Sequence, residues 1–228
     1  MTKLIYLIGI LISLDAYAGF RQIKVAIVDT GLDLSDKRFA RHLCKAGGSD
    51  LTGEGINDTI GHGTHVAGIV VLNTKNPNYC LMIYKYWSES ASGNVSMRRS
   101  VNAFKLAIKQ GADIINYSSN GEAYDKEEYE VIKNNPKVKF IVAAGNDHLD
   151  LDSEVSYPAS YWLDNEVVVG ALGTNGKIYP SSNYGNQVVY EEGESIMSYI
   201  PNGMGTMSGT SMATALRTAK ILNSYVKK

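Results

Sequence analysis

Short runs of β-branched and aliphatic residues alternate along this chain with segments whose apolar side chains recur at helical spacing. The apolar runs predict buried strands at 23–28, 81–84, 112–118, 139–144, 167–169 and 187–190. The periodic segments predict helices at 62–72, 100–110, 126–134 and about 210–225. Strands that alternate with helices pair in parallel and are covered on both faces. We therefore expect an α/β fold, a three-layer sandwich with a mostly parallel central sheet.

Polar side chains lie at the carboxyl ends of three of the predicted strands. Asp29 follows the first strand, Ser118 is the last residue of the third, and Asn146 comes two residues after the fourth. In open parallel sheets the ligand site lies at the carboxyl ends of the strands. These three residues are therefore expected to lie near one another at a functional site.

The first residues have the pattern of a cleaved leader. Lys3 precedes an apolar run over 4–14, and Ala16-Tyr17-Ala18 has the small-x-small form of a signal peptidase site. We predict a signal peptide at 1–18 and an exported protein, secreted or periplasmic. An uncleaved anchor or a buried terminal helix is the alternative, although the run is short for a bilayer.

The rest of the chain, 19–228, is expected to form one compact domain. Of the 228 residues, 44% are hydrophobic, which is enough for one sizeable core. Few residues separate Ala18 from the first strand, so no propeptide is recognisable. The net charge of −1 gives no reason to expect nucleic acid or an anionic membrane as partner. Cys44 and Cys80 could form a disulfide or remain two buried thiols.

Three motifs supply an acid, an imidazole and a hydroxyl, and a fourth supplies a side-chain amide. In chain order they are Val28-Asp29-Thr30-Gly31, Gly61-His62-Gly63-Thr64-His65-Val66-Ala67-Gly68, Ala143-Ala144-Gly145-Asn146 and Gly209-Thr210-Ser211-Met212-Ala213. The order Asp, His, Ser is that of subtilisin. The chain resembles the subtilase family of serine peptidases from about Ile23 to the last helix. Tyr157-Pro158 and Ser181-Ser182-Asn183-Tyr184-Gly185 add to the resemblance.

The resemblance implies a subtilisin-like fold and a serine endopeptidase that acts through an acyl-enzyme. Asp29, His62 and Ser211 would be the catalytic triad, and Asn146 would be the oxyanion-hole amide. A serine hydroxyl is a weak nucleophile, so His62 would accept its proton while Asp29 orients the imidazole. The Asn146 amide and the Ser211 backbone N–H would stabilise the oxyanion.

The same resemblance implies where a protein or peptide substrate binds. An extended substrate would pair with the backbone of Ser118, Ser119, Asn120 and Gly121. Ser119 stands where many relatives have Leu, and Ser156, in the primary pocket, stands where they often have Gly. We therefore expect a more polar and shallower pocket. A separate inhibitor or chaperone is a further possible partner, and no membrane contact is expected once the leader is removed.

No cofactor is expected for the chemistry. The acidic loop of Asp147, Asp150, Asp152 and Glu154 could bind a structural calcium ion, attract basic substrates or simply be solvated. His65, three residues after His62, could suggest a metal pair, but the Glu of a zinc helix motif is missing. A packed or hydrogen-bonded His65 is the favoured interpretation.

Some positions depart from the family pattern. After the nucleophile the family usually has Pro and His where this chain has Ala215 and Leu216. With the missing propeptide, this leaves a second hypothesis open: a non-catalytic peptide-binding module that keeps the fold. An esterase is less well supported, because the Ser211 motif lacks the second Gly of a nucleophile elbow.

Overall fold

The computed structural model describes residues 21–225, so the predicted signal peptide and its cleavage site lie outside the described residues. A seven-stranded sheet forms the middle layer, and every neighbouring pair in it is parallel. The strand order is β2-β3-β1-β4-β5-β6-β7. The strands are β1 (Ile23–Asp29), β2 (Ser49–Asp50), β3 (Tyr79–Lys85), β4 (Ile114–Tyr117), β5 (Lys139–Ala143), β6 (Glu166–Leu172) and β7 (Val189–Glu192).

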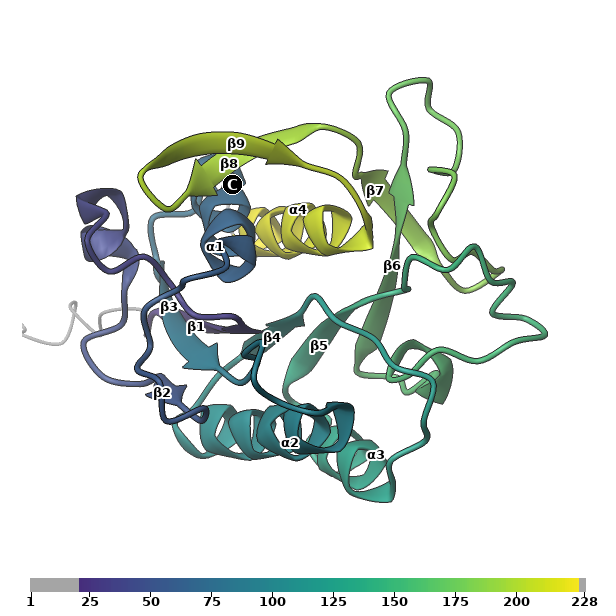
Figure 1. Cartoon of the computed structure of the whole chain (residues 1–228), viewed down its shortest axis with the longest axis horizontal. Helices are drawn as coiled ribbons and strands as arrows, with labels where there is room; N and C mark the ends of the chain where they lie inside the picture. The colour runs from purple at the N-terminus through teal and green to yellow at the C-terminus, as the bar shows by residue number, and fades with distance from the viewer. Residues whose placement is uncertain (1–20, 226–228) are drawn as a thin grey trace, which may run out of the picture.

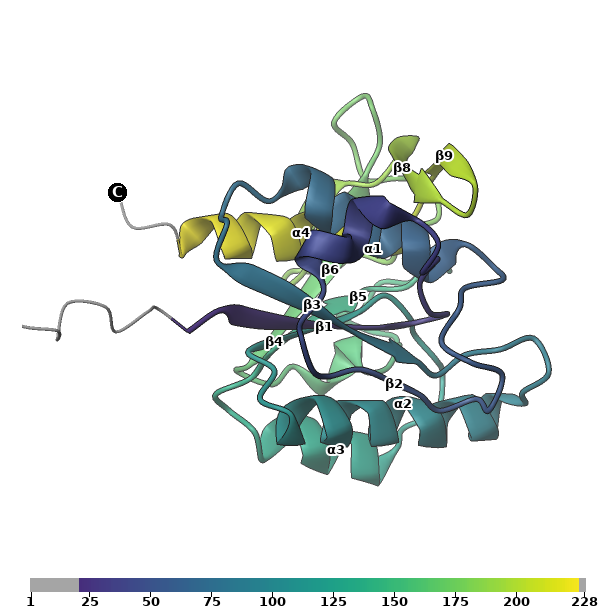
Figure 2. The same ribbon diagram turned by 90° about the vertical axis from the view of Figure 1, so that its left-hand side faces the viewer.

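Two pairs of helices cover the two faces of the sheet, as Figures 1 and 2 show. Helices α1 (His62–Asn73) and α4 (Thr210–Ser224) pack on one face. Helices α2 (Gly93–Lys109) and α3 (Lys126–Lys133) pack on the other. Each face has its own buried apolar cluster, so the expected three-layer α/β sandwich is confirmed.

An antiparallel hairpin, β8 (Ile196–Ile200) with β9 (Gly203–Met207), lies over the outer side of α1 (Figure 1). Because α1 is enclosed between this hairpin and the sheet, its residues from Gly63 to Val70 are all buried. The hairpin was not predicted individually from the sequence. Two short 3-10 helices complete the fold, η2 (Lys37–His42) and η3 (Ala159–Tyr161).

All the predicted helices and strands are present, but several of their boundaries differ. Strand β3 begins two residues earlier than predicted, β4 begins two residues later, and β6 continues three residues further, while the short strand β2 was not predicted. Helix α2 begins at Gly93 rather than at residue 100, because its first turns bury serines such as Ser96 and Ser100 instead of apolar side chains. Strand β7 begins at Val189 rather than at Gln187. Gln187 lies in the turn that precedes the strand.

Cys44 and Cys80 form a disulfide, which resolves the alternative that the sequence left open. Cys80 is the second residue of β3, so the bond ties the segment after η2 to the amino-terminal half of that strand.

Within residues 21–225, none of the helices combines enough length with enough apolar character to cross a bilayer.

The strand order reverses beside β1. The chain places β3 on one side of β1 and β4 on the other, and then continues outward through β5, β6 and β7. The carboxyl ends of β1 and β4 therefore border the crevice in which open α/β sheets bind ligands. Asp29 is the last residue of β1, and Ser118 follows β4 directly.

Candidate active site

Asp29 is held at the end of β1 by a sharp turn. Gly31 has a φ of +108°, and a Cβ at this position would lie 2.3 Å from the carbonyl oxygen of Ile56. Only glycine therefore fits here. The Thr30 N–H donates a hydrogen bond of 2.8 Å to Asp29 Oδ1, and Asp29 is only 4% exposed. The carboxylate is thus fixed in a nearly water-free position.

His62, the first residue of α1, faces this carboxylate. Its Nδ1 lies 2.7 Å from Asp29 Oδ1. Because a carboxylate can only accept, Nδ1 carries the proton and Nε2 of the neutral ring remains free to accept another. Burial disfavours the imidazolium, but the charge of Asp29, its hydrogen bond to the ring and the charge of Asp58 together outweigh burial and raise the pKa of His62. The pair has the geometry of an oriented general base.

Asp58 organises the start of α1, and sequence reasoning missed it. This carboxylate is 2% exposed. It accepts hydrogen bonds from the hydroxyls of Thr30 and Thr64 and from the backbone N–H groups of Ile60, Gly61 and Thr64. Burial opposes its ionisation, but these donors together lower its pKa. No local signal marks Asp58 in the sequence, because it lies three residues before Gly61, which occupies the N-cap position of α1.

Ser211 is the second residue of α4, the helix that begins after Gly209. Its hydroxyl donates to the carbonyl oxygen of Ser118 at 3.1 Å, and the Ser118 hydroxyl donates to the Ser211 carbonyl at 3.2 Å. Within residues 21–225, no hydrogen bond joins Ser211 to His62. Rotation about the Cα–Cβ bond of Ser211 is needed to bring its hydroxyl to the imidazole.

Asn146 follows β5 and stands beside the start of α4. Its Oδ1 accepts hydrogen bonds from the backbone N–H of Thr210 at 3.0 Å and from the Thr210 hydroxyl at 3.2 Å. Asn146 is exposed, and its Nδ2 donates to no atom in the described part of the chain. The amide nitrogen is therefore available as a donor next to the amino end of the helix that carries Ser211.

The segment after β4 forms one side of the crevice. Gly121 and Tyr157 exchange two backbone hydrogen bonds, of 2.9 and 2.7 Å. Asn120 Nδ2 lies 3.1 Å from Ser156 Oγ and 3.3 Å from Asp147 Oδ2. Ser156 is 2% exposed, so the exposed Asn120 amide covers it.

Two neighbouring hollows open along this crevice. One of about 280 Å³ is lined by residues that include Asp29, His62 and Ser119. The other, of about 540 Å³, is lined by residues that include Ser119, Asn120, Gly121 and Tyr157. Tyr86 and Trp87 border both. Asp29, His62 and Ser118 thus line the smaller hollow, Asn120 and Gly121 line the larger one, and Ser119 borders both. Ser211, Asn146 and Ser156 line neither hollow.

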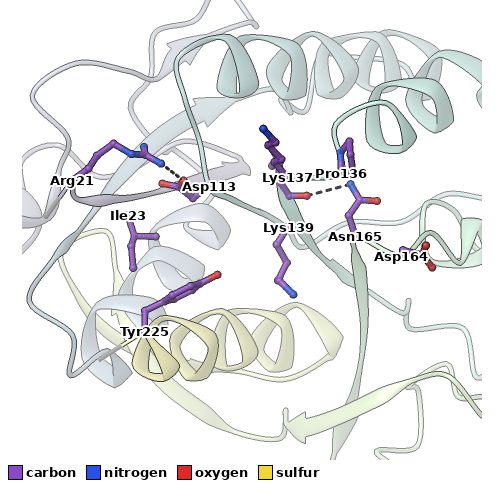
Figure 3. A pocket seen from close by; sticks show the side chains of 10 residues that line it. Arg21, Ile23, Asp113, Pro136, Lys137, Lys139, Asp164, Asn165 and Tyr225 are labelled. Atoms are coloured by element: carbon purple, nitrogen blue, oxygen red, sulfur yellow. Dashed lines mark hydrogen bonds and ion pairs between the residues drawn. The ribbon is translucent and has the colours of Figure 1, made fainter. Parts of the chain in front are cut away.

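A third hollow, shown in Figure 3, lies at the opposite edge of the sheet. Its volume is about 230 Å³, and it is lined by residues at the amino ends of the strands, including Arg21, Asp113, Lys139 and Asn165. None of the residues predicted to be functional lines it. The candidate chemistry is therefore confined to the carboxyl edge.

His65 is fully buried, and its Nε2 lies 3.1 Å from the carbonyl oxygen of Gly205 on β9. Nε2 must donate to that carbonyl. Burial lowers the pKa of His65, in agreement with a neutral ring. The interpretation of His65 as a packed, hydrogen-bonded histidine is confirmed.

The acidic loop does not fit a cation site. Asp150 and Glu154 accept hydrogen bonds from backbone N–H groups of the loop itself, and Asp152 accepts from Asn186. Within residues 21–225, no group of three or more His, Cys, Asp or Glu side chains is arranged to hold a metal ion.

Comparison with known proteins agrees with this geometry. A sequence profile described as "Subtilase family" matches residues 21–222. The "Major intracellular serine protease" of Bacillus subtilis (strain 168) is 35% identical over 214 residues, which cover 85% of this chain and 65% of that protein. The "Intracellular serine protease" of Paenibacillus polymyxa is 34% identical over 214 residues, covering 85% and 64%. The chain thus spans slightly less than two thirds of the length of these relatives.

Solved structures give the same result for the fold. The crystal structure of "a cold adapted subtilisin-like serine proteinase" superposes with a TM-score of 0.74 at 25% identity, covering 90% of this chain and 77% of that one.

Proposed function

The chain belongs to the subtilase family, and we propose that it is a serine endopeptidase that cleaves peptide bonds through an acyl-enzyme. The observation that carries this proposal is the 2.7 Å contact between Asp29 and His62 beside Ser211 and Asn146. A module that only bound peptides would have no use for an oriented imidazole next to a serine at a helix start.

Ser211 begins the reaction by turning its hydroxyl from the Ser118 carbonyl to Nε2 of His62. His62 accepts the proton as Ser211 Oγ attacks the peptide carbonyl, and Asp29 stabilises the imidazolium that forms. His62 then returns the proton to the leaving amine, and water hydrolyses the acyl-enzyme by the same route.

The negative charge of the tetrahedral intermediate falls on the former carbonyl oxygen. Asn146 Nδ2 and the backbone N–H of Ser211 are the donors for this oxyanion. The dipole of α4 adds to their effect, because Ser211 lies in the first turn of that helix. No cofactor takes part in these steps.

Labelling with a fluorophosphonate tests the proposal. We expect the probe to modify Ser211 in the wild-type protein, with the site located by mass spectrometry, and to leave the Ser211→Ala variant unmodified. Within residues 21–225, Ser211 forms no hydrogen bond with His62, and this observation favours one alternative, a non-catalytic peptide-binding module. Folded protein that resists labelling would support that alternative.

For substrate preference, we propose that the primary pocket accepts small or polar side chains. The Asn120 amide bridges Ser156 and Asp147 across the site, and this fills space that a large side chain would need. Protein or peptide chains would bind in extended form along Ser118, Ser119, Asn120 and Gly121. A separate inhibitor or chaperone remains part of the proposal.

We also propose that the protein is exported. The support is the leader pattern of residues 1–18 together with the disulfide between Cys44 and Cys80, a bond that persists mainly in oxidising compartments. Cell fractionation tests this: tagged protein recovered in the cytoplasm with an intact leader would contradict it.

A further inference from the structure

Four polar residues lie close together on the face of the sheet that α2 and α3 cover, away from Asp29 and His62. They are Asp125 at the start of α3, Glu128 on α3, Tyr161 at the end of η3 and Glu166 at the start of β6, and we call them the Glu128 cluster. Glu128 is completely buried. The proposed chemistry does not use it, so its presence in the core requires another explanation.

The hydroxyl of Tyr161 shows which form of Glu128 fits. This oxygen lies 3.0 Å from the carbonyl oxygen of Asp125 and 3.0 Å from Glu128 Oε2, and it accepts from the Asp125 N–H at 3.3 Å. A tyrosine hydroxyl has one proton and cannot donate to both oxygens. Because a carbonyl only accepts, all three contacts are hydrogen bonds only when Glu128 is the neutral acid and donates to Tyr161.

The surroundings favour the same neutral form. Oε1 of Glu128 and Oε1 of Glu166 are both buried without a hydrogen-bond partner. An unpartnered charge is far more costly to bury than an unpartnered neutral oxygen. Burial raises the pKa of Glu128 to about 7, and the charge of Asp125 adds to this shift. Burial also raises the pKa of Glu166 to about 8, with a contribution from Glu128.

No basic group in residues 21–225 offsets these acids. Neither Glu128 nor Glu166 forms an ion pair with Lys, Arg or His there. From the neighbouring helix α2, Lys105 pairs with the exposed Glu127 instead. From β4, Tyr117 is the titratable neighbour, and burial together with Glu128 raises its pKa to about 12. Tyr117 therefore stays neutral whenever Glu128 titrates.

Tyr161 connects the Glu128 cluster to the substrate crevice. Its ring centroid lies 4.9 Å from that of Tyr157, the residue that exchanges two backbone hydrogen bonds with Gly121. At the other end of α3, the Asn165 amide donates to the backbone carbonyls of Ile132, Asn135 and Val138. These hydrogen bonds fix the carboxyl end of α3. When Glu128 ionises, the side chains that change position are therefore those near the amino end of α3, Tyr161 and, in contact with it, Tyr157.

We infer that Glu128 is a positioning residue for substrate binding: as a neutral acid it holds Tyr161, and through it Tyr157, whose two hydrogen bonds to Gly121 keep the segment 118–120 in place to pair with substrate, and its ionisation raises KM. This inference rests on the proposed peptidase function. It differs from the role of His62, because titration of His62 changes kcat/KM through the chemical step, whereas titration of Glu128 changes substrate binding.

Steady-state kinetics with a fluorogenic peptide between about pH 6 and about pH 9 tests the inference. We expect KM of the wild type to rise about fivefold or more across this range. The Glu128→Gln variant should keep the low KM throughout, since its amide N–H donates to Tyr161 at every pH. Glu127→Gln, on the exposed side of the same helix, is the matched control and should follow the wild type. A wild-type KM that does not change with pH, or a parallel rise in Glu128→Gln, would overturn the inference.

Tyr161→Phe provides a second variant in case Glu128→Gln does not fold. Without the hydroxyl, KM should be high at about pH 6 and should no longer vary with pH. A pH dependence like that of the wild type would also overturn the inference.

Two measurements separate this inference from the proposed function. The infrared carbonyl band of a protonated carboxyl group should persist in the folded wild type at about pH 6 and should lose intensity in Glu128→Gln, whether or not the protein cleaves peptides. The pKa of Glu128 is about 7 in the folded state against 4.5 for the ordinary group, so the wild type should lose stability relative to Glu128→Gln as the pH rises from 4.5 through 7. If the infrared band and the pH dependence of stability are as expected but the protein cleaves no peptide, only the proposed function is wrong. If the infrared band is the same in the wild type and in Glu128→Gln, the inference about Glu128 is wrong.

Discussion

Asn146 accepts two hydrogen bonds from Thr210, one from the backbone and one from the hydroxyl, and both go to the same oxygen, Oδ1. This fixes which end of the amide faces solvent. The nitrogen end is left exposed before any substrate arrives, and Thr210 immediately precedes Ser211 in the chain. Donor and nucleophile are therefore held by one short segment.

Replacing Asn146 by Ala should remove this donor, and it also takes the Oδ1 acceptor away from the buried Thr210, so the stability of the variant is measured beside its activity. We expect kcat to fall by about two to three orders of magnitude and KM to change little, as is typical when one oxyanion donor is lost. Steady-state kinetics on a peptide substrate measures both. A fall in kcat of less than about threefold would mean that Asn146 does not face the oxyanion.

The pH profile of kcat, which the expected change in KM does not affect, should report the raised pKa of His62. The neutral imidazole is the active form, so activity should rise with pH and reach half its maximum above 6.5, the ordinary value for histidine. Asp29→Asn removes the negative charge that raises this pKa. We expect the half-maximal pH to move down and kcat to fall by about four orders of magnitude, because the ring loses the partner that fixes its tautomer. An unshifted profile in the variant would argue against the contact between these residues.

Asp58→Asn should weaken both the fold and the chemistry. The amide cannot accept from all five donors that surround the carboxylate, and we expect a loss of about 1.5–3 kcal/mol in the free energy of unfolding. Because the folded-state pKa of Asp58 lies below its ordinary 3.8, the difference from the wild type should narrow as the pH falls below that value. Urea unfolding at several pH values measures this difference in the free energy of unfolding. The control is Asp164→Asn, a substitution of an exposed aspartate.

Removing the disulfide should reduce stability and spare the chemistry. The two cysteines are 36 residues apart, and closing a loop of this size is worth about 4 kcal/mol in the loop-entropy treatment. The double variant Cys44→Ser/Cys80→Ser should lose that amount in urea unfolding. Its labelling at Ser211 should persist under conditions where it is still folded. Equal stability of the oxidised wild type and the double variant would show that the bond does not stabilise the native state.

Asn120→Gly should widen the primary pocket. Without the amide that covers Ser156, the ratio of kcat/KM for large against small side chains at the cleavage site should rise about tenfold. Asn94→Ala, which alters the same 540 Å³ hollow at α2, is the control and should leave the ratio unchanged. A peptide library shows the result directly, and a wild-type preference for large aromatic residues would contradict the proposal.

The layers and the position of the site could be predicted because each depends on local patterns. The run from Ile23 to Val28 is apolar because β1 is covered on both faces, and Asp29 ends it because the strand ends there. The Asp29–His62 contact and the placement of Asn146 follow once the strand ends meet at one edge.

What the sequence did not reveal depends on contacts between distant segments. Asp58 looks like any loop carboxylate until the hydroxyls of Thr30 and Thr64 meet it. Glu128 sits in an amphipathic helix, where a glutamate is ordinarily solvated, and only Tyr161 and Glu166 show that it is buried. The pairing of Cys44 with Cys80 depended on a separation that no spacing encodes.

The placement of Ser211 on α4 has a consequence for biosynthesis. Asp29 and His62 leave the ribosome early, but the serine lies on a helix that packs against β4, β5, β6 and β7, and its neighbour Thr210 bonds to Asn146. A nascent chain that ends before α4 has neither the nucleophile nor the helix that orders the Asn146 amide. Under the proposed function, the machinery for cleaving proteins is therefore incomplete while the polypeptide is being translated, and unfinished copies do not digest themselves or one another.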